Sequence, residues 1–464
     1  MNFPLPALAL AAIAACASPD ALATDYYLSD CQAGAAASCV AGSPTNDGLS
    51  AARPKRLASQ LPPLQGDDRV LYARGGAWID AGMGIYIPTA SANHPVTWQD
   101  YIPPWGSSAK PILIESRSGR YLFNISDGGI KAADGGYVVS NLDLRGGGKG
   151  GGEAAIFLYY AVNDVVMENL DISGFNVGVY AAHNPDVSGG WENYRVTLRN
   201  SHIHGNVSFG WLGGAETLLI ENNSFDHNGT RIMFDHDVYL STVTNGIVRG
   251  NSMSYSVLNA SGQCSGSVIV AHGAVKGLTI ANNKILQQAS VAQCYGIELS
   301  GGYDATLPGE YFHDVLISSN TIVNVGYVGI GLRGCTRCVV EDNQLVWTGG
   351  GGSQGISMYV NNPGSNDELG TALTIRSNSI FMQDASGSPG IIRLLNEGTG
   401  HTITSNLIYM GSSTAPSALC FDPSTYTIAQ LKAFDNNLCF RAGGASYSSA
   451  FATLQAATQA GFDV

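Results

Sequence analysis

Charged side chains are scarce in this chain: Asp, Glu, Lys and Arg make up only 13% of its 464 residues. Lys and Arg contribute 23 residues against 36 acidic ones, which gives a formal net charge of −13. No basic run is present that could displace counterions from a polyanion. The composition therefore argues against nucleic acid or an anionic membrane surface as a partner.

Helical periodicity and long apolar runs are also missing. The 58 glycines argue against a helical bundle, and a hydrophobic content of 45% argues against a disordered chain. Beyond the N-terminal region, no stretch is long and apolar enough to span a membrane. Gly and Asn supply the left-handed backbone positions that tight turns need. We therefore expect an all-β protein with many turns.

The first 23 residues read as an export signal. Ala7 to Ala15 is apolar, and Ala21-Leu22-Ala23 offers a small-residue cleavage site, although the n-region lacks Lys and Arg. A signal peptide over residues 1–23 predicts a secreted or periplasmic protein. Ile13-Ala14-Ala15-Cys16 also resembles a bacterial lipobox, so a lipid anchor on Cys16 is an alternative.

Eight cysteines remain after Cys16, and they fall into pairs of sequence neighbours. An even number in an exported chain suggests disulfides, although the sequence alone does not fix their connectivity. The CxxC pair is not accompanied by a second CxxC or a paired His motif, so we expect a structural bridge or free thiols there and not a zinc site. The pairs are Cys31/Cys39, Cys264/Cys294, Cys335/Cys338 and Cys420/Cys439.

A repeat begins at residue 138. Ten rungs lie between Leu142 and Asn406, which is about 29 residues per repeat. The later rungs read apolar-x-apolar-x-x-Asn-x-apolar, and in the first three the Asn stands one place earlier. An Asn that recurs at one turn position can stack as an amide ladder. The rungs are centred on Asn141, Asn169, Asn200, Asn222, Asn251, Asn283, Asn320, Asn343, Asn378 and Asn406.

A second strand with alternating apolar residues follows most rungs, for example Ile156-Phe157-Leu158-Tyr159 and Val238-Tyr239-Leu240. Two or more short strands per repeat predict a single-stranded parallel β-helix of about ten or more coils. We expect an N-terminal cap and first coils over residues 24–137, the β-helix over 138–411, and a C-terminal capping segment over 412–464. Residues 428–434 and 450–457 predict short helices in that segment, and residues 54–60 predict one in the N-terminal cap.

This organisation resembles the secreted right-handed parallel β-helix proteins of the pectate-lyase-like superfamily. The residues that carry the resemblance are Gly66-Asp67-Asp68-Arg69-Val70-Leu71, the turn Arg74-Gly75-Gly76-Ala77-Trp78 and the ten rungs. It covers nearly all of the mature chain and implies a right-handed coil. The superfamily contains polysaccharide lyases, glycoside hydrolases, uronan C5-epimerases, esterases and non-catalytic surface proteins, so the fold does not choose among them.

The residues between the buried positions of the second strands should point outward, about 4.8 Å apart from coil to coil. Aromatic residues at one end and titratable residues in the middle of this column would suit an extended sugar chain, because rings stack on sugar faces and charged groups bind hydroxyl or uronate groups. We expect a polysaccharide or oligosaccharide as the partner. The column contains Tyr159, Tyr180, Trp211, Asp237, Tyr239, His272, Glu298, Arg333, Tyr359 and Arg393, with Lys276 near His272.

The stretch Asp235-His236-Asp237-Val238-Tyr239 is the most polar part of this column. Strict alternation turns Asp235, Asp237 and Tyr239 outward and His236 inward, unless a corner before Asp237 lets His236 swing out. Asp235 and Asp237 could together bind calcium. Uronan C5-epimerases carry Asp-Pro-His-Asp; here Asp235 stands one place late and the Pro is missing, so that likeness is partial.

The leading functional prediction is an exported lyase that cleaves a uronic-acid glycan by β-elimination. His236, His272, Lys276 and Arg333 are candidates for the base or for neutralising the carboxylate, and Tyr239 could protonate the leaving oxygen. The resemblance to pectate lyases implies Arg or Lys as base and calcium held by carboxylates. An inverting glycoside hydrolase using Asp237 and Glu298, a uronan epimerase and a non-catalytic glycan-binding surface protein stay open as alternatives.

Overall fold

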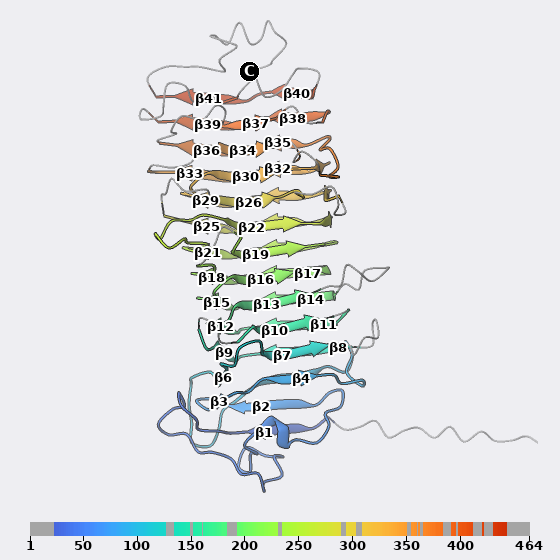
Figure 1. The fold of residues 1–464 in the computed structure, drawn as a ribbon, viewed down its shortest axis with the longest axis vertical. Coiled ribbons are helices and arrows are strands. Elements are labelled where there is room, and N and C mark those ends of the chain that lie inside the picture. Colours follow the sequence, from blue (N-terminus) through green and yellow to red (C-terminus); the bar gives the residue numbers. More distant parts are fainter. Residues whose placement is uncertain are drawn as a thin grey trace, which may run out of the picture.

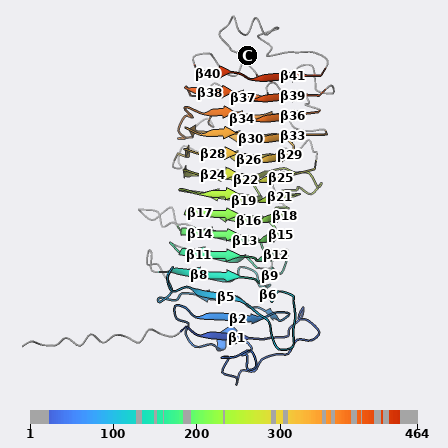
Figure 2. The same cartoon turned by 180° about the vertical axis from the view of Figure 1, so that it is seen from behind.

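The chain folds into a parallel β-helix whose coils stack along one axis from the N-terminal to the C-terminal end (Figures 1 and 2). Three long sheets, named here A, B and C, form its walls. In every coil that has a strand in all three sheets, the chain visits them in that order. The computed structural model describes residues 23–126, 134–148, 152–159, 161–182, 193–230, 234–288, 294–302, 309–349, 354–359, 361, 365–383, 391–395, 398–411, 420–421 and 430–442.

Sheet A contains 14 parallel strands, each aligned with the strand one coil away. They are β1 (Asp25–Leu28), β2 (Arg69–Ala73), β5 (Val96–Tyr101), β8 (Gly135–Ser140), β11 (Asn163–Glu168), β14 (Asn193–Arg199), β17 (Ala215–Glu221), β20 (Ile247–Arg249), β24 (Thr279–Ala281), β28 (Leu316–Ser318), β32 (Val339–Glu341), β35 (Thr374–Arg376), β38 (His401–Thr404) and β40 (Leu431–Asp435).

Sheet B contains 13 short strands that follow those of sheet A across a sharp turn. They are β3 (Ala77–Ile79), β6 (Ile112–Glu115), β9 (Asp143–Gly146), β12 (Asp171–Ser173), β15 (His202–His204), β18 (Ser224–Asp226), β21 (Ser252–Ser254), β25 (Lys284–Leu286), β29 (Thr321–Val323), β33 (Gln344–Trp347), β36 (Ser379–Met382), β39 (Leu407–Met410) and β41 (Leu438–Arg441).

Sheet C contains 11 strands, and three further short strands form a small sheet beside sheet A. Sheet C is made of β4 (Met83–Ile85), β7 (Tyr121–Ser126), β10 (Ala154–Tyr159), β13 (Val177–Ala182), β16 (Phe209–Gly213), β19 (His236–Ser241), β22 (Ser267–His272), β26 (Tyr295–Leu299), β30 (Val328–Leu332), β34 (Gln354–Met358) and β37 (Ile392–Leu394). The small sheet is made of β23 (Ala274–Lys276), β27 (Tyr311–His313) and β31 (Cys335–Thr336).

Alternation along each strand fills the interior of the coils. Ile172, Ile203 and Phe225 occupy successive coils of sheet B and are fully buried, while their sequence neighbours face outward. The buried apolar residues form one continuous cluster from Leu28 to Cys439. Burial of each large aliphatic side chain stabilises the fold by about 1.5–3 kcal/mol, so the core grows with every coil.

The predicted amide ladder is present at the turn between sheets A and B. In each step the side-chain Nδ2 of one Asn donates to Oδ1 of the Asn one coil further on, at 2.9–3.1 Å. That Oδ1 also accepts the backbone N–H of the donating Asn, as Asn251 does from Asn223. Buried amides are thus satisfied without water. The ladder is formed by Asn223, Asn251, Asn283, Asn320, Asn343, Asn378, Asn406 and Asn437.

The Asn residues of the first rungs belong to a different column. Asn141, Asn169, Asn200 and Asn222 have positive φ angles between 51° and 58°, so they occupy the left-handed turn position just before the ladder. Leu142 takes the ladder position in its coil. The apparent shift of one place therefore reflects two turn positions that both favour Asn.

All four pairs of neighbouring cysteines form disulfides: Cys31–Cys39, Cys264–Cys294, Cys335–Cys338 and Cys420–Cys439. The proposed signal peptide and Cys16 lie outside the described residues, apart from Ala23. Within the described part of the chain, no helix is long and apolar enough to cross a membrane.

The helices predicted for residues 428–434 and 54–60 need correction. Residues 431–435 form strand β40, and β41 follows, because the Asn437 turn adds one more coil to the stack. The repeat is less regular there, because Lys432 replaces the first apolar residue of the pattern while Phe434, Asn437 and Cys439 keep the other positions. The second predicted C-terminal helix, residues 450–457, lies outside the described residues. In the N-terminal cap, only Ala58–Gln60 is helical, as a three-residue 3-10 turn.

Candidate functional site

A groove of about 610 Å³ lies on the outer face of sheet C, in the middle of the stack. Its lining comes from β16, β19, β22 and β26 and from adjoining segments, including Arg333 directly after β30. Five of the residues predicted for the site line it together: His236, Tyr239, His272, Glu298 and Arg333. Three further lining residues, Phe209, Tyr295 and Glu310, were not predicted.

A second cavity, of about 590 Å³, lies between the N-terminal segment and the first coils. Leu57, Leu61, Trp78, Ile85 and Trp98 are among its mostly apolar lining. Binding sites combine apolar walls with a few convergent polar groups, and the groove on sheet C has more of these groups. The groove, named here the sheet C groove, is therefore the candidate functional site.

Strand β19 does not alternate strictly, and this decides which residues reach the groove. Asp237 and Val238 are both fully buried, while Tyr239 faces outward. The aligned position of Asp237 one coil earlier is Gly210, where an added Cβ would meet the buried Phe225 ring. The chain thus turns a corner at this position, and two successive residues point into the coil.

The prediction that Asp237 faces outward was therefore wrong. Its Oδ1 accepts a hydrogen bond from Nδ2 of Asn228 at 2.8 Å, inside the corner. Burial raises the pKa of the Asp237 carboxyl to about 7, although hydrogen bonds from Asn228 and Ser256 lower it in part. Asp237 cannot act as one carboxylate of a hydrolytic pair with Glu298, because it does not reach the groove.

The pair Asp235 and Asp237 also does not fit a calcium site. Asp237 faces an amide N–H donor in the core, whereas calcium is bound by several converging oxygen atoms. Asp235 is only 2% exposed and is not part of the groove lining. Among the described residues these two carboxylates do not join any group of three potential metal ligands.

His236 takes the outward side of the corner, where it is covered by its neighbours. Its ring lies 5.8 Å from that of Phe209 and 5.5 Å from that of Tyr239. Nδ1 is 2.7 Å from the carbonyl oxygen of Ser267, so Nδ1–H donates and Nε2 is the acceptor nitrogen. Burial lowers the pKa of His236 to about 4, so the ring is neutral at neutral pH.

His272 is held by a carboxylate that the repeat pattern does not reveal. Its Nδ1 lies 3.1 Å from Oε2 of Glu310, and the same oxygen accepts the backbone N–H of Gly273 at 2.8 Å. The Tyr239 ring stacks on the His272 ring with 5.3 Å between centroids. Donation from Nδ1–H to Glu310 leaves Nε2 of His272 as the basic nitrogen of a His–carboxylate pair.

Glu298 and Arg333 complete the groove on the C-terminal side. Glu298 shares an outward column with Tyr239, two coils away, and accepts a short hydrogen bond from the Ser267 hydroxyl. The Arg333 guanidinium lies 5.4 Å from the centre of the Tyr359 ring, in a cation–π arrangement. Carboxylate and guanidinium groups therefore face the same groove from neighbouring coils.

Aromatic rings continue the outer face of sheet C toward the N-terminal end. Tyr121 stacks on Phe157 with 4.2 Å between ring centroids, and Phe157 contacts Tyr159 at 5.2 Å and Tyr180 at 5.1 Å. The outward placement of Tyr159 and Tyr180 agrees with the prediction. Trp211 does not: it is fully buried, and its Nε1–H donates to the carbonyl oxygen of Gly213.

Like Tyr159, Tyr180 and Trp211, the three other predicted substrate-binding residues do not line the groove. Lys276 ends β23 in the small sheet, where it is exposed and aligned with His313. Arg393 belongs to the outward column of sheet C, next to Ser357, but does not line the groove. Tyr359 contacts the groove through Arg333 without lining it.

Asp367 is a further residue that sequence reasoning missed. Its carboxylate accepts the backbone N–H of Gly302 at 2.8 Å and that of Glu310 at 2.9 Å. It thereby fixes the segment that carries Glu310. Glu310 and Asp367 stand in segments between strands, so neither the rung pattern nor the period-2 pattern could have found them.

Part of the chain matches the model of a known protein family. Residues 130–312 match the family described as "Right handed beta helix region". Together with the stacked parallel sheets, this match supports the right-handed parallel β-helix fold that the sequence predicted. No curated protein matches the chain.

Several solved structures are similar to this one at low identity. An alginate lyase from Paenibacillus sp. str. FPU-7 is 16% identical with a TM-score of 0.45, covering 66% of this chain and 96% of the lyase. A GH136 lacto-N-biosidase from Eubacterium ramulus is 12% identical with a TM-score of 0.49, covering 90% and 68%. The mannuronan C-5 epimerase A-module from Azotobacter vinelandii is 10% identical with a TM-score of 0.44, covering 82% and 90%. Likenesses at this level do not transfer an activity.

Proposed function

We propose that this protein is a polysaccharide lyase that cleaves a uronic-acid glycan by β-elimination in the sheet C groove. The observation that carries the proposal is the His272–Glu310 pair, stacked against Tyr239 in the same groove as Arg333. These residues provide a base, an acid and a cation, which are the three groups that β-elimination next to a carboxylate requires.

In the proposed reaction Nε2 of His272 removes the proton from C5 of the uronate. The electrons of the C5–H bond form the C4=C5 double bond, and the C4–O bond to the preceding sugar breaks. The Tyr239 hydroxyl donates its proton to the leaving oxygen, and proton exchange with solvent restores both side chains. Glu310 stabilises the imidazolium that forms on His272.

Arg333 binds the uronate carboxylate and stabilises the negative charge that develops as C5 loses its proton. The cation–π contact with Tyr359 limits the rotation of the guanidinium. His236 is a binding residue in this scheme and not the base, because a pKa of about 4 makes it a poor proton acceptor. Its neutral ring keeps a lone pair on Nε2 that can accept a hydrogen bond from the substrate.

The aromatic strip of Tyr121, Phe157, Tyr159 and Tyr180 continues the groove along sheet C and supplies stacking surfaces for further sugar units. Successive coils are about 4.8 Å apart, so neighbouring sugars of an extended chain would meet rings one or two coils away. This favours a polysaccharide over a short sugar as the substrate.

Calcium dependence of the activity stays a prediction, although Asp235 and Asp237 do not form the calcium site. The Glu298 and Glu310 carboxylates of the groove are oxygen ligands of the type calcium takes, although both already accept hydrogen bonds. Loss of activity after treatment with a calcium-selective chelator, restored by added calcium, would support a calcium requirement. Full activity in the chelator would refute it.

The test is a panel of uronic-acid glycans incubated with the purified protein, followed by ultraviolet absorbance of the conjugated C4=C5 product. We expect absorbance with at least one glycan, and its loss in His272→Asn, Tyr239→Phe and Arg333→Ala. His313→Asn is the matched control, because His313 also pairs with a carboxylate, that of Glu368, but lies outside the groove.

Three outcomes would overturn the proposal. New reducing ends without unsaturation would identify a hydrolase, and inversion at C5 without cleavage, detected by NMR, would identify an epimerase. Glycan binding without any product across the panel would identify a non-catalytic binding protein. Unchanged turnover in His272→Asn would exclude the assigned base even if the protein is a lyase.

A further inference from the structure

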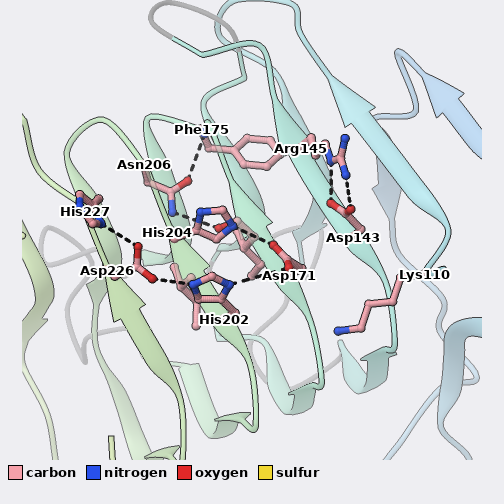
Figure 3. A network of polar contacts seen from close by, with 12 residues as sticks. Lys110, Asp143, Arg145, Asp171, Phe175, His202, His204, Asn206, Asp226 and His227 are labelled. Atoms are coloured by element: carbon pink, nitrogen blue, oxygen red, sulfur yellow. Dashed lines mark hydrogen bonds and ion pairs between the residues drawn. The ribbon is translucent and has the colours of Figure 1, made fainter. Parts of the chain in front are cut away.

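A cluster of histidines and aspartates lies on the outer face of sheet B, away from the sheet C groove (Figure 3). It is built on strands β12, β15 and β18 of three successive coils. Asp171 is aligned with His202, and His204 is aligned with Asp226, while Ile172, Ile203 and Phe225 between them point into the core. The alternation of the strands therefore brings the polar side chains to one face.

Three of these residues converge on a common point. His202 and His204 stand two residues apart on one strand, and their rings stack with 4.1 Å between centroids. Asp171 faces both: its Oδ1 lies 2.9 Å from Nε2 of His204, and its Oδ2 lies 3.8 Å from Nδ1 of His202. One donor atom from each of the three residues lies within 4.8 Å of the other two.

These separations suit a single small cation. Two ligand atoms at about 2.0–2.1 Å from a tetrahedral ion are about 3.3 Å apart. The two measured separations from the Asp171 oxygens, 2.9 and 3.8 Å, lie on either side of that value. Small side-chain rotations are enough to bring the three atoms to one ion, because all three side chains are partly exposed.

A second carboxylate orients His202 for this role. Oδ2 of Asp226 lies 2.6 Å from Nε2 of His202, so that nitrogen carries the proton when the ring is neutral. The lone pair then belongs to Nδ1, the nitrogen that faces Asp171. Oδ1 of Asp226 is in turn 2.9 Å from Nδ1 of His227, which fixes the carboxylate. Carboxylates hold metal-binding histidines through their second nitrogen in the same way.

The cationic side chains around the cluster are engaged elsewhere. Arg145 forms a two-point ion pair with Asp143, and Nζ of Lys110 donates to the carbonyl oxygen of Asn169 at 2.6 Å. Asp171 and Asp226 therefore form their ion pairs with the histidines, while Lys110 and Arg145 act on Asp171 electrostatically from beyond ion-pair distance. Two carboxylates next to two imidazoles form a site that a divalent cation would neutralise.

We propose that Asp171, His202 and His204 bind a divalent transition-metal ion of the zinc class, with Asp226 as the positioning residue for His202. Two imidazole nitrogens and one carboxylate oxygen favour Zn²⁺ and its transition-metal neighbours over Ca²⁺ and Mg²⁺, which prefer all-oxygen ligands. The bound ion would join β12 to β15 across two coils. Three protein ligands leave one position of a four-coordinate ion open to water at the protein surface.

The test uses the tag-free mature protein, stripped of metal with a chelator and titrated with Zn²⁺ alone by isothermal calorimetry. We expect one Zn²⁺ per chain, and a melting temperature that rises with the Zn²⁺ concentration because the ion binds only the folded site. Substitution of Co²⁺ should give the visible absorption of a nitrogen- and oxygen-ligated ion. His202→Asn and His204→Asn should abolish stoichiometric binding.

Two variants separate a metal site from a structural network. Asp226→Asn should weaken Zn²⁺ binding by about 10- to 100-fold while one ion per chain is still bound. His94→Asn is the matched control, because His94 pairs with Asp67 at the exposed surface without a second histidine. The absence of stoichiometric Zn²⁺ binding to the wild-type chain would overturn the proposal. So would binding that survives unchanged in His204→Asn, or binding of Ca²⁺ in preference to Zn²⁺.

Discussion

Nδ1 of His272 lies 3.1 Å from Oε2 of Glu310, although 38 residues separate them in the sequence. The contact exists because β22 ends at His272 and the next coil returns the chain past it just before β27. Under the proposed function, this carboxylate sets the tautomer of the base and stabilises its protonated form.

Glu310→Gln should therefore lower kcat by about 10-fold or more and leave KM nearly unchanged, since general acid–base catalysis contributes about 10²–10⁴-fold in total. Gln retains an acceptor oxygen for the N–H of Gly273 but lacks the negative charge. Steady-state kinetics of the unsaturated product measures both constants. Glu368→Gln, which alters the carboxylate of the His313 pair, is the control. A rise in KM at constant kcat would show that Glu310 only shapes the groove.

Arg333 should determine the preference for a charged substrate. Arg333→Lys keeps the positive charge but loses the two-point recognition of a carboxylate and the cation–π contact of the guanidinium with Tyr359. We expect Arg333→Lys to raise KM for the uronic-acid glycan, and Arg333→Ala to lower kcat/KM by a further 10-fold or more.

The comparison that isolates this role uses a methyl-esterified form of the same glycan, in which the carboxylate charge is absent. The effect of Arg333→Ala should be much smaller on that substrate. Arg337→Ala, which removes an exposed arginine paired with Asp314, is the control. An equal loss on charged and esterified substrates would contradict the assignment.

The amide ladder should contribute strongly to stability. Asn320 donates from Nδ2 to the carbonyl oxygen of Ile280 at 2.9 Å, and its Oδ1 accepts two hydrogen bonds from Asn283. Asn320→Ala leaves these buried groups without partners, at about 1–3 kcal/mol for each group. We expect the free energy of unfolding to fall by about 3 kcal/mol or more, measured by denaturant titration followed by tryptophan fluorescence.

The control for the ladder is Asn282→Gly. Asn282 is exposed and has a φ angle of 56°, a conformation that Gly adopts without steric strain. This variant should change stability by only a few tenths of a kcal/mol. If both variants had equal effects, turn geometry and not the ladder would explain the recurring Asn.

The fold was predictable because each coil of a β-helix repeats the same sequence pattern. Each coil repeats the apolar alternation and the turn Asn. A strand that is assigned wrongly in one coil can therefore be recognised by comparison with the next coil. The last coil was missed because it has no successor and because Lys432 stands where the repeat has its first apolar residue. The apolar spacing of residues 428–434 also resembles that of a helix, so the sequence pattern predicted a helix there and not a strand.

The site was predictable only where the side chains sit on regular strands. Tyr239 and Glu298 share a column because period 2 holds between them and the coil spacing is constant. Asp237 and Trp211 were misplaced because the strand turns a corner and sends two successive residues inward. A signal for this corner was present: Gly178, Gly210, Gly296, Gly329 and Gly355 precede the buried residue of the same strand in other coils.

Asp237 and His236 should give the protein opposing responses to pH. Burial raises the pKa of Asp237 to about 7, so between about pH 4 and 7 the folded protein holds a proton that the unfolded chain has released. Its contribution to stability is complete below the unfolded pKa and is lost as the pH rises to 7. Burial lowers the pKa of His236 to about 4, so its contribution is lost as the pH falls from about 6.5 to 4.

Asp237→Asn isolates the first effect, because Asn resembles the protonated carboxyl and does not ionise, while His236 is common to both proteins. The free energy of unfolding of the variant minus that of the wild type should rise with pH between 4 and 7 and then level off. A shift of about three pKa units sets an upper limit of about 4 kcal/mol for that rise. Denaturant titrations at pH 4, 5.5, 7 and 8 measure it, with the exposed Asp47→Asn as control. A difference that stays constant with pH would show that Asp237 is ionised in the folded corner across this range.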